Sequence, residues 1–232
     1  MMRGQAFRYL GWQFLDWAGP RLLASLAISF ALSWTARRAM GETPPAEPQL
    51  RMIIAQLHMQ LAFIFVLLFL HGIVSVDRNQ GYFRFYMAKP VSPVWFYGQG
   101  LVLALLGTLA ASAGYVVSTS LLIRPLWVWS VVPQALVMFA IFGMLMFALN
   151  MVTKLDWLGA IAVVFVSSFL RHNWPASQSR LGKVLEAVLP PNQLIGSTVH
   201  PTPGQWLWIA GWGIGLFALG LLILWRRPLG EN

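Results

Sequence analysis

Long, mainly apolar stretches recur along this chain, and they constrain its fold more than any other feature. A helix needs about 20 such residues to cross the hydrocarbon core of a bilayer. Of the 232 residues, 58% are hydrophobic and only 10% are charged, whereas soluble domains average about 25% charged residues. The composition therefore excludes an ordinary soluble globule and predicts an all-α integral membrane protein.

Six apolar segments are predicted to span the membrane. Their approximate limits are 18–36, 55–76, 95–123, 126–152, 157–170 and 206–225. The fifth has 14 residues, which is short for a full crossing. Tryptophans lie at or near the limits of these segments, as expected for indole rings at the level of the lipid headgroups. They are Trp34, Trp95, Trp127, Trp129, Trp157, Trp206, Trp208 and Trp225.

Residues 1–17, ahead of the first span, are predicted to form an interfacial helix. Phe7, Leu10, Phe14 and Trp17 are spaced so that they share one stripe of a helix. A short helix with one aromatic face and flanking arginines suits the headgroup plane. The alternative is that these residues form the start of the first span. The domain division is then 1–17 for this helix and 18–232 for the six-span transmembrane domain.

Between spans five and six, residues 171–205 are predicted to be re-entrant. Leu181, Leu185 and Val188 follow helical spacing, and Pro190 and Pro191 then stop any helix. Together with the short fifth span, this pattern indicates a half-crossing followed by an amphipathic return helix at the non-cytoplasmic surface. An ordinary surface loop after a longer fifth span is the alternative.

The basic residues favour cytoplasmic termini by a small margin. With that orientation, nine lie on the cytoplasmic side: Arg3, Arg8, Arg21, Arg78, Arg84, Lys89, Lys154, Arg226 and Arg227. Seven lie on the other side: Arg37, Arg38, Arg51, Arg124, Arg171, Arg180 and Lys183. This excess follows the positive-inside rule. The net charge of +9 is scattered between apolar runs, so it indicates membrane orientation and no nucleic-acid partner.

Few residues could carry catalytic chemistry. The chain has no cysteine, and it has no phosphate-binding glycine loop, serine-hydrolase elbow or zinc-protease helix motif. Asn150, Lys154 and Asp156 cluster between spans four and five, where we expect a solvated turn and, as the alternative, a proton or ion relay. We therefore expect no enzyme activity, metal or cofactor in this chain, and any ATP must be hydrolysed elsewhere.

His58 and His71 lie 13 residues apart on the second span. That separation occurs between haem-ligating histidines of membrane cytochromes, but no other span carries such a pair. Thirteen steps of about 100° also leave the two side chains about 140° apart around the helix. Packing or interfacial histidines are therefore favoured over haem ligands.

The segment 77–93, after the second span, holds the most informative motif. It runs Asp77-Arg78-Asn79-Gln80-Gly81-Tyr82-Phe83-Arg84-Phe85-Tyr86-Met87-Ala88-Lys89-Pro90-Val91-Ser92-Pro93. Its aromatic residues alternate with basic ones, and its prolines end the helix that it could form. A short basic and aromatic helix at the membrane surface suits a soluble partner. The alternative is a basic loop without a partner.

The chain resembles the type-2 permeases of ATP-binding cassette (ABC) exporters in its motif and in its layout. The motif is an acidic residue at 77 followed by Gly81, Pro90 and Ser92. The layout is six spans after an N-terminal interfacial helix. In that family the loop is a coupling helix that docks into the ATPase subunit, and the segment before the last span is re-entrant. The resemblance covers the whole chain in layout and 77–92 in residues.

The resemblance implies a multi-pass permease of the cell membrane that dimerises with a second copy or a paralogue and recruits an ABC ATPase. That ATPase would bind ATP and Mg²⁺. The implied docking residues are Asp77, Arg78, Gly81, Tyr82, Phe83, Arg84, Phe85, Lys89 and Pro90. Membrane lipid is the other expected partner. The alternative functions are a haem-binding membrane cytochrome and a non-transporting scaffold or assembly factor.

Overall fold

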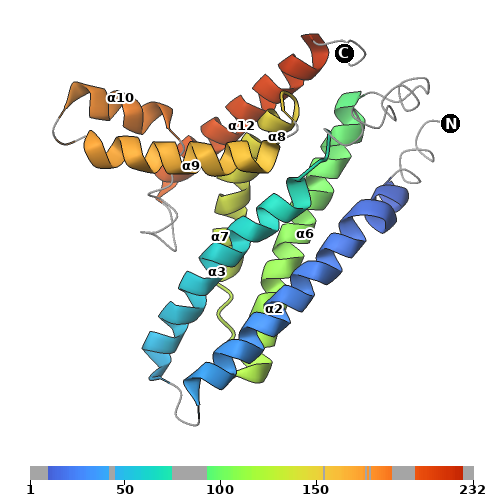
Figure 1. Cartoon of the computed structure of the whole chain (residues 1–232), viewed down its shortest axis with the longest axis vertical. Coiled ribbons are helices and arrows are strands. Elements are labelled where there is room, and N and C mark those ends of the chain that lie inside the picture. Colours follow the sequence, from blue (N-terminus) through green and yellow to red (C-terminus); the bar gives the residue numbers. More distant parts are fainter. Residues whose placement is uncertain are drawn as a thin grey trace. The chain divides into compact units, whose positions relative to one another are not determined.

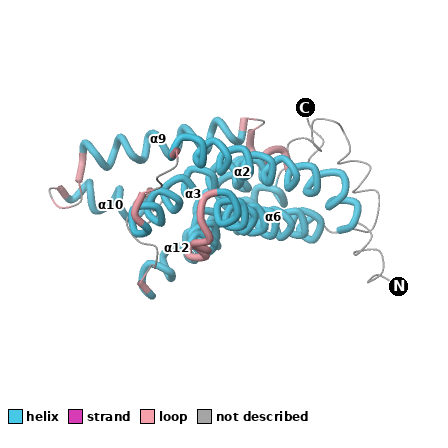
Figure 2. The backbone as a smooth tube through the Cα atoms, turned by 90° about the horizontal axis from the view of Figure 1, so that it is seen from below, coloured by secondary structure: helices cyan, strands magenta, loops and turns pink. Residues whose placement is uncertain are grey.

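The structure, a computed structural model, describes residues 10–41, 45–74, 93–153, 155–175, 177, 179–189 and 202–226. Within these ranges the chain is helical and contains no strand (Figures 1 and 2). The chain divides into two compact units. The first comprises Met1–Phe69 and Trp95–Phe139, and the second comprises Leu70–Val94 and Ala140–Asn232.

Four of the described helices are long and apolar enough to cross a membrane. Their spanning parts are Glu47–Leu70, Val94–Leu122, Val131–Asn150 and Pro203–Ile223. These four correspond to the predicted second, third, fourth and sixth spans. The helices at the predicted first and fifth spans do not meet both criteria. The described residues thus contain four helices that could cross a membrane, as expected of a membrane protein, and six crossings are not confirmed.

In the first unit, helix α2 (Gly19–Met40) follows a π-helical segment at Phe14–Ala18 without a break. The described part of the predicted N-terminal helix, from Leu10 onward, is therefore continuous with α2, and residues 1–9 lie outside the described ranges. Ser25, Ser29 and Ser33 are buried on one face of α2. Each donates its hydroxyl proton to the carbonyl four residues earlier, which satisfies these polar groups within the helix.

Helices α3 (Glu47–Leu70) and α6 (Pro93–Leu122) lie beside α2 in both views (Figures 1 and 2). Small residues on α6 allow close approach, as is common between membrane helices. Phe69 of α3 packs directly on Gly107, and Leu26 of α2 packs directly on Gly114. The Tyr115 hydroxyl also donates to the Ile54 carbonyl oxygen at 3.3 Å.

The limits of α3 differ from the predicted 55–76. The helix begins earlier, because Glu47 in its first turn suits the positive end of the helix dipole. It ends earlier because Gly72 takes a positive φ of 77°, a conformation in which glycine commonly ends a helix. By contrast, α6 matches its predicted span closely and begins with a proline at the first helical position.

The predicted fourth span, 126–152, becomes helical only from Val131. Trp127 has a positive φ of 47°, and its backbone N–H donates to Ser120 Oγ at 3.1 Å. The helix then runs through α7 (Val131–Met138), a π-helical segment at Phe139–Gly143, and α8 (Met144–Asn150). Residues 126–130 therefore form a turn ahead of the helix.

In the second unit, α8 packs against α9 (Asp156–Asn173) and α12 (Pro203–Arg226). Two glycines of α12 bring it close to its neighbour. A Cβ on Gly213 would lie 3.1 Å from the Ala140 carbonyl oxygen, and one on Gly220 would lie 3.0 Å from Phe147 Cε1. The rings of Phe147 and Phe217 stack with centroids 5.5 Å apart.

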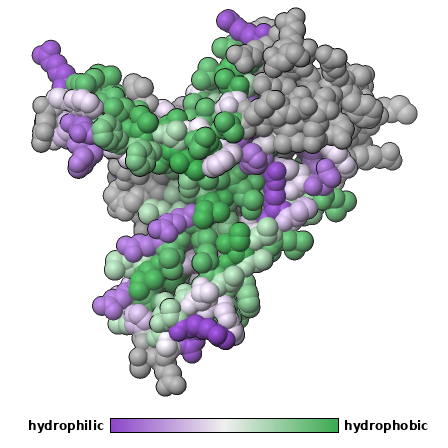
Figure 3. Space-filling model, in the orientation of Figure 1, coloured by the Kyte–Doolittle hydropathy of each residue, from purple (hydrophilic) through white to green (hydrophobic). Residues whose placement is uncertain are grey.

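Helix α9 has 18 residues, longer than the predicted fifth span. It packs against α10 (Arg180–Val188), where the sequence predicted an amphipathic helix. Ser179 caps α10 by accepting the Gly182 N–H at 2.9 Å. Leu181 and Val184 of α10 are exposed, and hydrophobic residues cover much of the visible surface of α9 (Figure 3). Pro190, Pro191 and the rest of 190–201 lie outside the described residues, so the re-entrant prediction is untested.

Candidate functional site

A fully buried carboxylate, Asp156, connects the first turn of α9 to the turn that follows α3. Its Oδ1 lies 2.9 Å from His71 Nδ1, and its Oδ2 accepts the Gly72 backbone N–H at 3.2 Å. The Asp156 side chain has no solvent exposure, whereas that of His71 is 48% exposed. The carboxylate therefore binds two adjacent residues of this turn, with the imidazole on the solvent side.

Asn150, at the end of α8, holds the same turn from a second direction. Its Nδ2 donates to the Leu70 carbonyl at 3.0 Å and to the Met146 carbonyl at 3.2 Å. Asn150 is buried, and its Oδ1 has no hydrogen-bond partner. Asn150 and Asp156 thus fix Leu70, His71 and Gly72 against α8 and α9.

The expected solvated turn between spans four and five is wrong for these two residues. Asp156 and Asn150 are buried because their polar atoms bind the backbone at the end of α3, which is far away in the sequence. Lys154 lies outside the described residues. The sequence holds one signal that Asp156 belongs to a helix and not to a turn. It stands directly before an apolar run, and an acidic residue there suits the first turn of a helix.

The predicted docking residues cannot be compared with the structure. Asp77, Arg78, Gly81, Tyr82, Phe83, Arg84, Phe85, Lys89 and Pro90 all lie in 75–92, outside the described residues. What the structure does describe is the chain that leads into this segment, as far as Val74. This is the part of the chain that Asp156 and Asn150 hold.

His58 and His71 have different surroundings. His58 is fully buried; its Nδ1 lies 3.3 Å from Gln134 Oε1, and its ring packs against Tyr115 with centroids 5.6 Å apart. The Nε2 atom of His58 is buried without a partner, while His71 binds Asp156. In the part of the chain that the structure describes, no three His, Asp or Glu side chains are grouped to hold a metal ion.

The first unit also contains a cavity of about 510 Å³ between α2, α3 and α6. Its wall comprises Leu32, Ser33, Thr35, Ala36, Ala39 and Met40 of α2, Ile53, Ile54, Leu57, Gln60, Leu61 and Ile64 of α3, and Tyr115, Thr119 and Ile123 beside them. The sequence gives no sign of this cavity, because it forms only where three separate helices pack together.

The fold defines a class: an all-helical protein in which four described helices could cross a bilayer, as expected of a membrane protein. No protein-family model, no curated protein and no solved structure matches the chain.

Proposed function

We propose that this chain is the transmembrane permease subunit of an ATP-driven ABC exporter. Segment 77–93 is its docking element for a separate ATPase subunit, and a second permease, identical or paralogous, completes the transporter. The chain itself binds no ATP or Mg²⁺; both belong to the ATPase. The motif of Asp77, Gly81, Pro90 and Ser92 supports this proposal.

One structural observation supports the proposal most: buried polar side chains hold residues 70–72, which lie shortly before the docking segment. Asp156 binds His71 and Gly72, and Asn150 binds Leu70. A loop that transmits force needs a firm attachment, because a loosely held loop absorbs the displacement of its partner. Asp156 and Asn150 give displacements of 77–93 a direct path to α9 and α8.

In this mechanism, closure of the ATPase dimer moves segment 77–93, and the attached helices rotate to open a path for the substrate. Coupling requires the segment to contact the two ATPase states with different free energies. Arg84 and Lys89 are the proposed charge partners of the ATPase. Tyr82, Phe83 and Phe85 are the proposed apolar anchors, since aromatic residues and arginine dominate interface hot spots.

The finer topology belongs to the same proposal. Helices α2 and α9 supply the first and fifth spans, both termini are cytoplasmic, and 171–205 is re-entrant. The exposed apolar residues Leu181 and Val184 of α10 suit a helix at the membrane surface. Phe165 and Phe169 of α9, also exposed, suit contact with lipid.

The test is purification from native membranes in mild detergent, with mass spectrometry and an absorbance scan of the same fraction. We expect an ATPase at near equal stoichiometry in a colourless sample. Phe85→Ala or Arg84→Glu should lose the ATPase or uncouple transport while the permease remains folded. Phe165→Ala and Arg180→Glu are matched controls on exposed positions and should retain the ATPase.

Three results would contradict the proposal. Full ATPase association and transport by both docking variants would remove 77–93 from the coupling role. A sample with a Soret band would favour the haem cytochrome, and a colourless protein without an ATPase would favour the scaffold.

A further inference from the structure

The cavity between α2, α3 and α6 has an almost wholly apolar wall. All four hydroxyl groups of its wall residues already donate within the protein. Ser33 donates to the Ser29 carbonyl at 2.8 Å and Thr35 to the Leu32 carbonyl at 3.0 Å. Thr119 donates to the Tyr115 carbonyl at 2.9 Å and Tyr115 to the Ile54 carbonyl at 3.3 Å. The remaining wall is largely aliphatic. At about 510 Å³ the cavity falls within the range of about 300–1,000 Å³ of small-molecule sites. Its wall suits a hydrocarbon chain.

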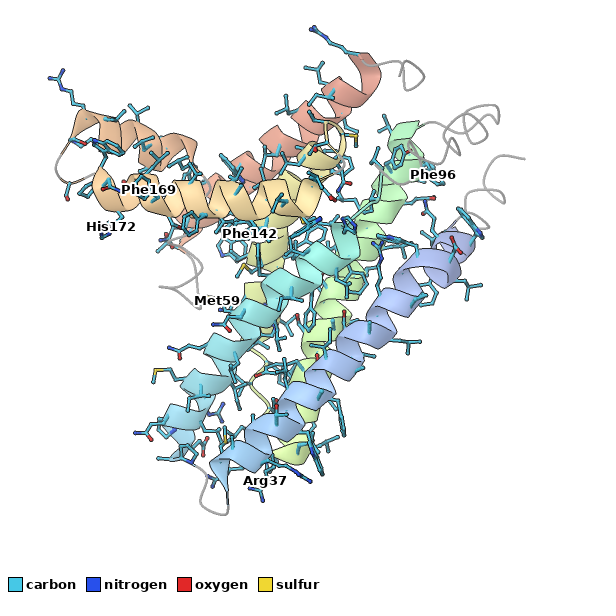
Figure 4. The ribbon with its side chains drawn as sticks, in the orientation of Figure 1. Arg37, Met59, Phe96, Phe142, Phe169 and His172 are labelled. Atoms are coloured by element: carbon cyan, nitrogen blue, oxygen red, sulfur yellow. The ribbon has the colours of Figure 1, made fainter. Side chains whose placement is uncertain are left out.

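The cavity lies at the end of the unit where α2 finishes, α3 begins and α6 finishes. Met40, Ile53 and Ile123 all line it, and Figure 4 shows Arg37 at this end of α2. Both α3 and α6 are apolar enough to cross a bilayer. A molecule in this cavity therefore lies at the depth of lipid chains near one membrane surface.

Positive charge surrounds this end of the cavity. Arg37 and Arg38 lie in the last turns of α2, Arg124 follows Ile123, and Arg51 lies in the first turns of α3. Among the described residues here, Glu47 supplies the acidic partner, and it pairs with Arg51 at 2.8 Å. Within the described ranges, Arg37, Arg38 and Arg124 form no ion pair with a carboxylate, which favours a negatively charged group beside them.

The two arginines at the C-terminal end of α2 keep hydrogen-bonding capacity. Arg37 Nη1 donates to the Gly41 carbonyl at 3.0 Å, and the Arg38 guanidinium lies 5.3 Å from the centroid of the Trp34 ring. A guanidinium has five N–H donors, so each of these contacts leaves donors for an anion. Arginine also matches the geometry of phosphate oxygens better than lysine does.

We propose that this cavity binds an acyl chain of an anionic phospholipid whose phosphate is held by Arg37, Arg38 and Arg124. The aliphatic wall accommodates the chain, and the arginines select the headgroup charge. The site concerns a resident lipid, and it stands whether or not the protein is an exporter.

The first experiment uses the full-length protein, purified and delipidated in neutral detergent. Phosphatidylglycerol and phosphatidylcholine with the same acyl chains are titrated in turn, and bound lipid is counted by native mass spectrometry. We expect tighter binding of phosphatidylglycerol. Replacing Arg37, Arg38 or Arg124 by glutamine should weaken it by roughly fivefold per arginine and should weaken phosphatidylcholine binding less, because the choline group offsets the charge of its phosphate. Arg226→Gln, at the end of α12, is the matched control and should bind as the wild type does.

A second variant tests the cavity itself. Ala36→Phe places a ring in the cavity and should reduce phosphatidylglycerol binding at least tenfold. Ala31→Phe makes the same substitution at an exposed position of α2 and should leave binding unchanged. Equal binding of the two lipids, or full binding by both Ala36→Phe and the arginine variants, would overturn the proposal. In that event the arginines serve only to orient the chain in the membrane.

Discussion

At the scale of single residues, Asp156 is a fully buried carboxyl group among the described residues, and its removal should cost substantial stability. Asp156→Ala leaves the buried Gly72 N–H without its acceptor, which should lower the free energy of unfolding by about 2–3 kcal/mol. His71→Ala should cost only about 1 kcal/mol, because His71 is 48% exposed and water can replace its imidazole. Chemical denaturation in detergent, followed by circular dichroism, measures both values.

The control for the Asp156 and His71 substitutions is an ion pair on an exposed helix surface. Glu47 and Arg51 lie 2.8 Å apart with about half of each side chain exposed, so Glu47→Ala should change stability by no more than about 0.5 kcal/mol. If Asp156→Ala proved as harmless as Glu47→Ala, the buried carboxylate would not hold His71 and Gly72, which precede the proposed docking segment.

At the scale of helices, the packing of α12 on α8 depends on which glycines face the neighbour. Gly213→Val should destabilise the protein by about 1–3 kcal/mol, because a Cβ there meets the Ala140 backbone carbonyl at 3.1 Å. Gly215→Val, two residues on, has open space around its Cβ and should lie within about 0.5 kcal/mol of the wild type.

The two substitutions change helix propensity equally, so the difference between their thermal unfolding midpoints reports the packing alone. Equal midpoints would mean that α12 does not approach the Ala140 carbonyl, in the π-helical segment before α8, as closely as the structure shows. The same reasoning explains why the exposed face of α12 tolerates both small and large residues, such as Gly211 and Leu207.

At the scale of the whole molecule, the number of crossings can be measured directly, because the chain has no cysteine. Single-cysteine variants at Gln5, Gly41, Gln80, Ser177 and Asn232 should react with a membrane-impermeant maleimide in intact cells only at positions 41 and 177. Permeabilised cells provide the control for total reactivity.

Each alternative topology gives its own labelling pattern. Positions 5 and 41 would share a side if α2 did not cross the membrane. Positions 80 and 177 would share a side if α9 did not cross. Either result would reduce the number of spans below six and would require a different orientation for one terminus.

The sequence by itself determined the class of the fold and much of the helix inventory. Hydropathy predicted spans at 95–123 and 206–225, within a few residues of α6 (Pro93–Leu122) and α12 (Pro203–Arg226). The agreement is close because an apolar run of bilayer length can be recognised from the local sequence alone. It also predicted a helix through Leu181 and Leu185, which is α10. The docking motif at 77–93 remains a prediction from sequence alone.

Only the tertiary structure decided the burial of Asp156 and the existence of the cavity. Asp156 is buried because its partners, His71 and Gly72, come from another part of the chain, so local polarity indicated a solvated turn instead. The cavity likewise arises where α2, α3 and α6 do not fill the space between them. Helical periodicity shows which face of one helix is apolar, but what that face meets depends on residues far away in the sequence.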